Sequence, residues 1–135
     1  MSEIIKLSRS TVEKYLSCPR CCVLDKKYKI KRPALPFTLN IAVDNLCKNE
    51  FDYYRRIQEP HPLFIENGID AVPFKHKDLE RWRSNFQGIR YKSFEHHYDF
   101  GGAVDDIWQK KNGDLIIVDV KATSRNNFNW SETFN

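Results

Sequence analysis

The chain has 135 residues, 41% of them hydrophobic and 13% aromatic, and a net charge of +4. This is about the modal length of one globular domain, and the apolar share argues against a disordered chain. No apolar run approaches the roughly 18 residues of a membrane span, and the start lacks the apolar core of a secretory signal. We therefore expect a cytoplasmic protein with no membrane partner, whose four cysteines are thiols or metal ligands.

The first third of the chain is basic. Residues 1–33 carry nine lysines and arginines against three acidic residues, a charge of +6 that leaves about −2 for the remainder. This asymmetry favours a protein that holds a polyanion with one part and a metal with another, and charge alone leaves a solvated helix face as the alternative. The candidate nucleic-acid contacts in this segment are Arg20, Lys26, Lys27, Lys29, Lys31 and Arg32.

Two helices are predicted in this basic segment. Ser10, followed three residues later by Glu13, matches a capping box and predicts a helix over residues 11–17. Cys18-Pro19-Arg20 interrupts that helix, and a second helix is predicted over residues 22–28. Residues 1–33 are therefore expected to be a basic helical segment.

A longer helix is expected after the proline-containing connector at residues 32–36. Thr38 is its candidate cap. Its apolar positions recur on or near one face, at Leu39, Ala42, Val43, Leu46 and Phe51. Residues 59–62 predict a loop, and residues 76–85 predict a short polar helix.

After Gly88 the pattern becomes typical of strands. Residues 89–97 alternate loosely, residues 103–109 are strand-like, and residues 115–122 are strongly so. A tight-turn signal of the Asn-Gly kind at residues 111–114 joins the last two. The order predicts an α+β domain in which N-terminal helices pack on a small, mainly antiparallel sheet.

Charged residues end the most apolar of these strands. Residues two apart on a strand point to the same face, so Asp119 and Lys121 are expected on one face. Ile116, Val118 and Val120 are then expected on the other face. Burying a carboxylate and an ammonium at the end of an apolar strand costs free energy, so such a pair indicates a functional role. A surface hairpin with an ordinary Asp–Lys pair is the alternative.

The hairpin brings a second carboxylate close to Asp119. Adjacent carboxylates repel one another unless a cation lies between them, and oxygen ligands with open positions suit Mg²⁺ or Mn²⁺. A lysine beside such a metal orients or deprotonates water, or offsets charge on a phosphate. A two-residue Asn112-Gly113 turn places Asp106 opposite Asp119, whereas a three-residue loop places Asp105 there.

The two ends of the chain resemble a known nuclease family. The run Gly102-Ala103-Val104-Asp105-Asp106-Ile107, followed by an apolar strand ending in Asp119-Val120-Lys121, is similar to the core of PD-(D/E)XK nucleases. Its closest pattern is that of the RecB-type and CRISPR-associated exonucleases. The segment from Leu7 to Arg20, with its Cys-Pro-Arg run, resembles the helix that opens these domains.

The resemblance implies a restriction-endonuclease-like core over residues 1–135 that hydrolyses DNA, as single strands or at duplex ends. Asp105 and Asp119 would be ligands of Mg²⁺ or Mn²⁺, and Lys121 would be the catalytic lysine. The family pattern also favours Asp105 over Asp106, so we predict the three-residue loop. The enzyme class implied is a metal-dependent deoxyribonuclease.

The sequence departs from the family in two places. The family carries a histidine ligand in a G-x-x-x-H pattern, whereas here Asp44 stands at that position, as an oxygen ligand or a solvent-facing aspartate. The family also continues into a helix with Gln-x-x-x-Tyr, and this sequence ends 14 residues after Lys121. We therefore expect a larger parent chain or a DNA-processing complex.

Other candidate sites are weaker. Cys18 and Cys21 have the spacing of half a zinc knuckle, but too few ligands follow for zinc or an iron–sulfur cluster to be expected. Glu95 and His97 share a face of the predicted strand and are candidates for contacts to the metal ligands. Two alternatives remain open: a catalytically silent nucleic-acid-binding module on the same fold, and an interaction domain holding zinc or a cluster with the two cysteines.

Overall fold

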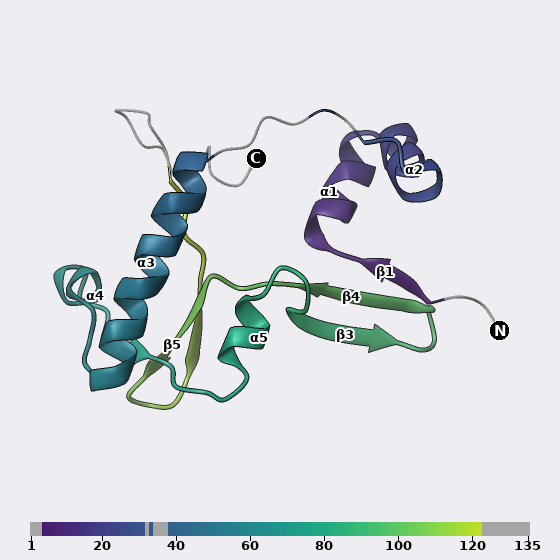
Figure 1. The fold of residues 1–135 in the computed structure, drawn as a ribbon. Helices are drawn as coiled ribbons and strands as arrows, with labels where there is room; N and C mark the ends of the chain where they lie inside the picture. Colours follow the sequence, from purple (N-terminus) through teal and green to yellow (C-terminus); the bar gives the residue numbers. More distant parts are fainter. Residues whose placement is uncertain (1–3, 32, 34–37, 123–135) are drawn as a thin grey trace. The chain divides into compact units, whose positions relative to one another are not determined.

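The computed structural model describes residues 4–31, 33 and 38–122 of the chain. The chain divides into two compact units, one of Met1–Pro36 with Glu80–Ala103 and the other of Phe37–Leu79 with Val104–Asn135. Each unit has its own three-stranded sheet as well as helices (Figure 1). The predicted α+β class is confirmed. No helix in the described ranges is long and apolar enough to cross a membrane.

The sheet of the first unit is mixed. Strand β1 (Ile5–Leu7) runs parallel to β4 (Tyr98–Gly102), which pairs antiparallel with β3 (Ile89–Ser93). The predicted strand is wrong beyond Ser93, because a turn follows in which His97 has the left-handed φ of 51°. Glu95 and His97 therefore do not share a strand face, which removes the geometric basis for choosing them.

Helices α1 (Arg9–Ser17) and α2 (Pro19–Tyr28) follow β1 in the first unit. The N-cap of α1 is Ser8, whose hydroxyl accepts a hydrogen bond from the Thr11 backbone N–H at 3.3 Å. The predicted capping box at Ser10 is therefore wrong, since that residue lies inside the helix. Ser8, two residues earlier, instead accepts from an N–H group in the first turn that has no partner within the helix.

A single residue separates the two helices. The backbone N–H of Cys18 donates to the carbonyl of Lys14 at 2.9 Å and ends α1, and its sulfur accepts from the Cys21 N–H at 3.2 Å at the start of α2. Pro19 is the first residue of α2, where its missing N–H leaves no helical hydrogen bond unmade. The predicted interruption at Cys18-Pro19 is confirmed.

The second unit packs a long helix on an antiparallel sheet. The helix is α3 (Thr38–Ile57), and the strands lie in the order β2 (Ala71–Pro73), β5 (Asp106–Lys110) and β6 (Leu115–Val118). Figure 1 shows α3 running alongside β5. The described residues also form two short helices, α4 (Pro62–Glu66) in the second unit and α5 (Leu79–Arg83), which begins at the last residue of the second unit's first segment and continues into the first unit.

Trp108 is at the centre of the second unit's core. It is fully buried, with the Phe64 ring stacked on it at 3.8 Å and the Phe51 ring edge-on at 5.2 Å. His61 is also buried there, with its ring 5.8 Å from the Trp108 ring. Its Nδ1 accepts a hydrogen bond from the Leu63 backbone N–H in the first turn of α4. Aromatic pairs of this geometry each contribute about 0.5–1.5 kcal/mol beyond the area that they bury.

A buried ion pair connects α3 to β5. Asp106 is 0% exposed and Arg55 is 7% exposed, and the Arg55 guanidinium donates to the carboxylates of Asp106 and Asp52. Its Nε also donates to the carbonyl of Phe74 at 2.8 Å, so the guanidinium is held from three directions. A buried carboxylate is tolerated only where a charge and hydrogen bonds compensate for the lost water.

We predict that Arg55→Met lowers the free energy of unfolding by about 3–5 kcal/mol, because it leaves Asp106 buried without its guanidinium partner. Urea denaturation followed by tryptophan fluorescence measures the change. Arg56→Met, at the exposed neighbouring position, is the matched control and should cost less than about 1 kcal/mol. Equal losses in the two variants would contradict the role assigned to the pair.

Candidate active site

The turn between β5 and β6 has three residues. The N–H of Gly113 donates to the carbonyl of Lys110 at 2.9 Å, and the N–H of Lys110 donates to the carbonyl of Asp114 at 2.9 Å. Gly113 has a φ of 93°, a conformation that side chains with a Cβ rarely adopt. The glycine therefore makes the three-residue loop accessible, and the prediction of that loop is confirmed.

This turn sets the register of the two aspartates. Asp106 pairs with Val118, so Asp105 and Asp119 are the next matched positions along the hairpin. Asp106 points into the core, where it meets Arg55. Asp105 is thus the aspartate aligned with Asp119, as the family pattern predicts.

Asp105 lies between the end of β6 and helix α3. Its side chain is half-buried, and its Oδ2 accepts a hydrogen bond from the backbone N–H of Val120 at 2.7 Å. Its Oδ1 lies 4.0 Å from the Nζ of Lys48. The carboxylate therefore contacts the backbone segment that carries Asp119 and Lys121.

Lys48 also contacts a second carboxylate. Its Nζ lies 2.7 Å from the Oδ2 of Asp44, one helical turn earlier on α3. Asp44 and Asp105 are far apart in sequence, yet both carboxylates approach the same ammonium. The sequence-based prediction did not include Lys48, although its spacing of four residues from Asp44 is the spacing of an ion pair along a helix.

Asp119 and Lys121 form their own ion pair. The Lys121 Nζ lies 2.7 Å from the Asp119 Oδ2, and both side chains are exposed. The two residues follow β6, which ends at Val118 rather than at the predicted residue 122. Val118 and Val120 pack against the core together with Ile116, so the prediction that these three share one face is confirmed.

The carboxylates of Asp44 and Asp105 both lie near the Lys48 ammonium. Its positive charge offsets part of the repulsion between the two negative charges. Mg²⁺ is commonly bound through one or two carboxylates, with water and phosphate completing its coordination. The sequence-predicted ligands Asp44 and Asp105 both lie near Lys48, and Asp105 and Asp119 come directly beyond the Asp106–Val118 pair of the hairpin.

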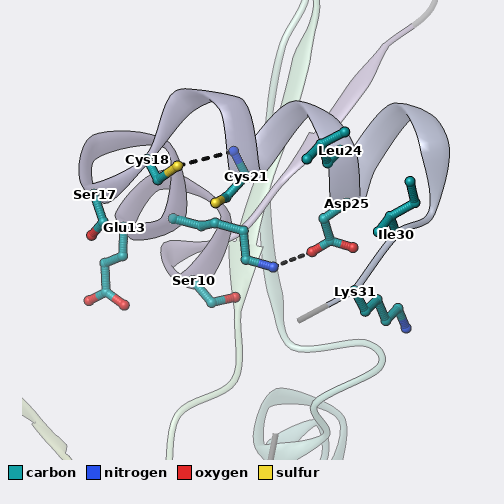
Figure 2. A pocket seen from close by; sticks show the side chains of 10 residues that line it. Ser10, Glu13, Ser17, Cys18, Cys21, Leu24, Asp25, Ile30 and Lys31 are labelled. Atoms are coloured by element: carbon teal, nitrogen blue, oxygen red, sulfur yellow. Dashed lines mark hydrogen bonds and ion pairs between the residues drawn. The ribbon is translucent and has the colours of Figure 1, made fainter. Parts of the chain in front are cut away.

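The cysteine motif lies in the first unit, beside a pocket between α1 and α2. Figure 2 shows Cys18 and Cys21 in this pocket, whose volume is about 440 Å³. Cys22 is buried, and its thiol donates to the carbonyl of Thr11 at 3.8 Å. Within residues 4–31, 33 and 38–122, no three side chains of the histidine, cysteine, aspartate and glutamate types are arranged to hold a metal.

The remaining cysteine belongs to the second unit. Burial raises the pKa of the Cys47 thiol, and the nearby carboxylates of Glu50 and Asp44 raise it further. A raised pKa keeps the thiol protonated at neutral pH, which disfavours a thiolate ligand or nucleophile. Cys47 therefore acts as a partly buried apolar residue beside the core.

The predicted nucleic-acid contacts are exposed wherever the structure describes them. Five of the six residues are described, and Arg32 lies outside the described residues. The exposed residues are Arg20, Lys26, Lys27, Lys29 and Lys31.

Some of this positive charge acts on a neighbouring acid. A hydrogen bond from Lys14 lowers the pKa of Asp25, and the charges of Lys14, Lys31 and Lys26 lower it further. Lys14 and Asp25 form an ion pair and both line the pocket, where Figure 2 labels Asp25. Asp25 therefore stays ionised and offsets only part of the positive field of α2.

No family model, curated protein or solved structure matches the chain. The functional interpretation consequently depends on the residues themselves and on their geometry.

We predict that Asp105→Ala speeds hydrogen exchange of the Val120 amide by at least about tenfold, because the amide loses its acceptor. Asp105→Asn keeps an acceptor oxygen at the same place and should retain most of the protection. Exchange rates measured by NMR test this, with Asp119→Ala as the control that leaves the acceptor in place. Equal protection in wild type and Asp105→Ala would rule out the hydrogen bond.

Proposed function

We propose that this chain is a metal-dependent nuclease of the PD-(D/E)XK class that hydrolyses phosphodiester bonds in DNA. The observation that carries the proposal is the approach of Asp44 and Asp105 to one ammonium, next to the segment with Asp119 and Lys121. A cation between carboxylates, with a lysine beside it, matches the chemistry that the resemblance implies.

In this proposal Asp105 and Asp119 hold Mg²⁺ or Mn²⁺, with Asp44 as a further oxygen ligand. When bound, the ion polarises the scissile phosphate and makes a nearby water more acidic. The ammonium of Lys48 would have to move aside, since it lies among the same oxygens. Lys48 then keeps the carboxylates together in the absence of the metal.

Lys121 is the residue proposed to act on the reactants. Its ammonium lies against the Asp119 carboxylate and is exposed, so a phosphate or water approaching Asp119 also meets Lys121. There it can orient the attacking water, or offset the negative charge that builds up on the phosphate. The basic residues of α2 would bind the phosphate backbone without reading its sequence.

A catalytically silent binding module on the same fold is the second candidate. The position of Lys48 favours it, because an ammonium beside Asp44 and Asp105 offsets one of their two negative charges without a metal. Such a protein would bind nucleic acid through its basic segment and show no metal-dependent hydrolysis.

We predict that Asp119→Ala and Lys121→Ala each reduce Mg²⁺-dependent cleavage of labelled DNA at least about a hundredfold and leave DNA binding nearly unchanged. The reason is that both side chains act on the reacting phosphate rather than on the backbone contacts. Lys110→Ala, an exposed lysine of β5, is the matched control and should cleave normally. Near-normal cleavage by either site variant would remove the mechanism, and no cleavage by wild type would favour the silent module.

We predict that reversing Lys26, Lys27 and Lys29 to glutamate weakens DNA binding alike for all sequences. The slope of log affinity against log salt should fall by up to about three units, since three phosphate contacts are lost. Fluorescence anisotropy at several salt concentrations measures the slope.

The control for this charge reversal is the same change at Lys75, Lys77 and Lys110, three exposed lysines outside the basic segment. Their reversal should leave a steeper dependence of log affinity on log salt than reversal of Lys26, Lys27 and Lys29 does. An unchanged slope after reversal of Lys26, Lys27 and Lys29 would show that these lysines are only solvated.

A further inference from the structure

The sheet of the first unit has an exposed face of aromatic side chains. Tyr91 pairs with Phe100 across β3 and β4, which places both side chains on the same face. They are 65% and 40% exposed, although aromatic residues in strands normally pack against a core. The ring of Tyr98, two residues before Phe100 on β4, lies 6.4 Å from the Tyr91 ring and extends this face.

Other residues widen the aromatic face. Ile5 of β1 pairs with Tyr98, and Ile89 of β3 lies two residues before Tyr91; both are exposed. At the turn between β3 and β4, the His96 ring lies parallel to the Tyr98 ring, with the centroids 6.2 Å apart. The face therefore presents several flat rings to solvent.

The unit that carries this face is positively charged. The alternate strand positions, which point to the opposite face of the sheet, hold Lys6, Arg90 and Lys92 around Asp99, and Arg90 donates to the Asp99 carboxylate at 3.0 Å. The described part of the first unit, residues 4–31 and 80–103, carries twelve lysines and arginines against five acidic residues. An exposed apolar face marks an interaction site, and its aromatic rings and the positive charge of the unit suit a partner with flat apolar groups and negative charge.

We propose that this aromatic face is a binding platform for single-stranded nucleic acid, on which bases stack on Tyr91, Tyr98 and Phe100. Unpaired bases offer flat faces to aromatic rings, and the net positive charge of the unit attracts their phosphates. Duplex DNA hides the faces of its bases and therefore cannot use the rings. A protein partner would match the apolar side chains but has no general reason to match the charge.

The platform deepens the proposed function by specifying a single-stranded substrate, yet binding to it needs no metal. The test uses the full chain in EDTA and fluorescein-labelled oligo(dT), oligo(U) and a DNA hairpin duplex, with anisotropy as the measurement. We expect at least one single strand to bind about tenfold more tightly than the duplex. Tyr91→Leu and Phe100→Leu should each weaken that binding by about 5- to 100-fold and change duplex binding by less than about twofold.

Two controls separate stacking from apolar contact and from general charge. Leucine preserves apolar character and removes the ring, whereas Tyr91→Trp keeps a ring and should bind at least as tightly as wild type. Phe86→Leu changes a 99% exposed aromatic residue outside the strands and should bind as wild type does. Circular dichroism checks that each variant is folded.

The outcomes distinguish the platform from the nuclease. Wild-type affinity in Tyr91→Leu and Phe100→Leu, equal losses for duplex and single strands, or no single-strand binding would each overturn the platform. The stronger of oligo(dT) and oligo(U) identifies which of these two strands, DNA with thymine or RNA with uracil, the platform prefers. Loss of binding in the platform variants, in a protein that cleaves nothing with Mg²⁺, would support the platform and refute the proposed nuclease.

Discussion

Arg55 and Asp106 form an ion pair between α3 and β5 from which water is almost excluded. Because Asp106 points into the core and pairs with Arg55, the preceding residue, Asp105, is the aspartate that can contact other parts of the unit. Asp105 then reaches the backbone of Val120 and the ammonium of Lys48. The chemistry proposed for this protein thus depends on a structural ion pair that takes no part in it.

In the candidate site, the Lys48 ammonium lies near the two carboxylates that would hold a metal in the proposed nuclease. Lys48 bridges Asp44 and Asp105 and lowers the cost of bringing their charges together. A divalent cation gives the same carboxylates more electrostatic stabilisation, but it must displace the ammonium to do so. The nuclease and the silent binding module therefore differ in the occupant of one position, which makes metal binding the property that separates them.

Local turn chemistry alone did not predict the register of the hairpin. The Asn112-Gly113 pair is typical of a two-residue turn, and the family resemblance selected the three-residue loop that aligns Asp105 with Asp119. Where two local solutions were close in energy, as for a cap at Ser8 or Ser10, the pattern selected the wrong one. Features made by distant residues, such as the parallel pairing of β1 or the approach of Lys48 to Asp105, have no local signal in the sequence.

Paramagnetic broadening by Mn²⁺ tests the central claim most directly, because it locates a bound cation without requiring activity. Substoichiometric Mn²⁺ added to the isotope-labelled chain should broaden the amide signals of Asp44, Asp105 and Val120 first. The amide signal of Asp106, whose side chain is paired with Arg55, should also broaden because it is the next residue after Asp105. Asp105→Asn should greatly reduce the broadening of all these signals. No broadening near Asp105, or strongest broadening around Asp25, would contradict a metal site at these carboxylates.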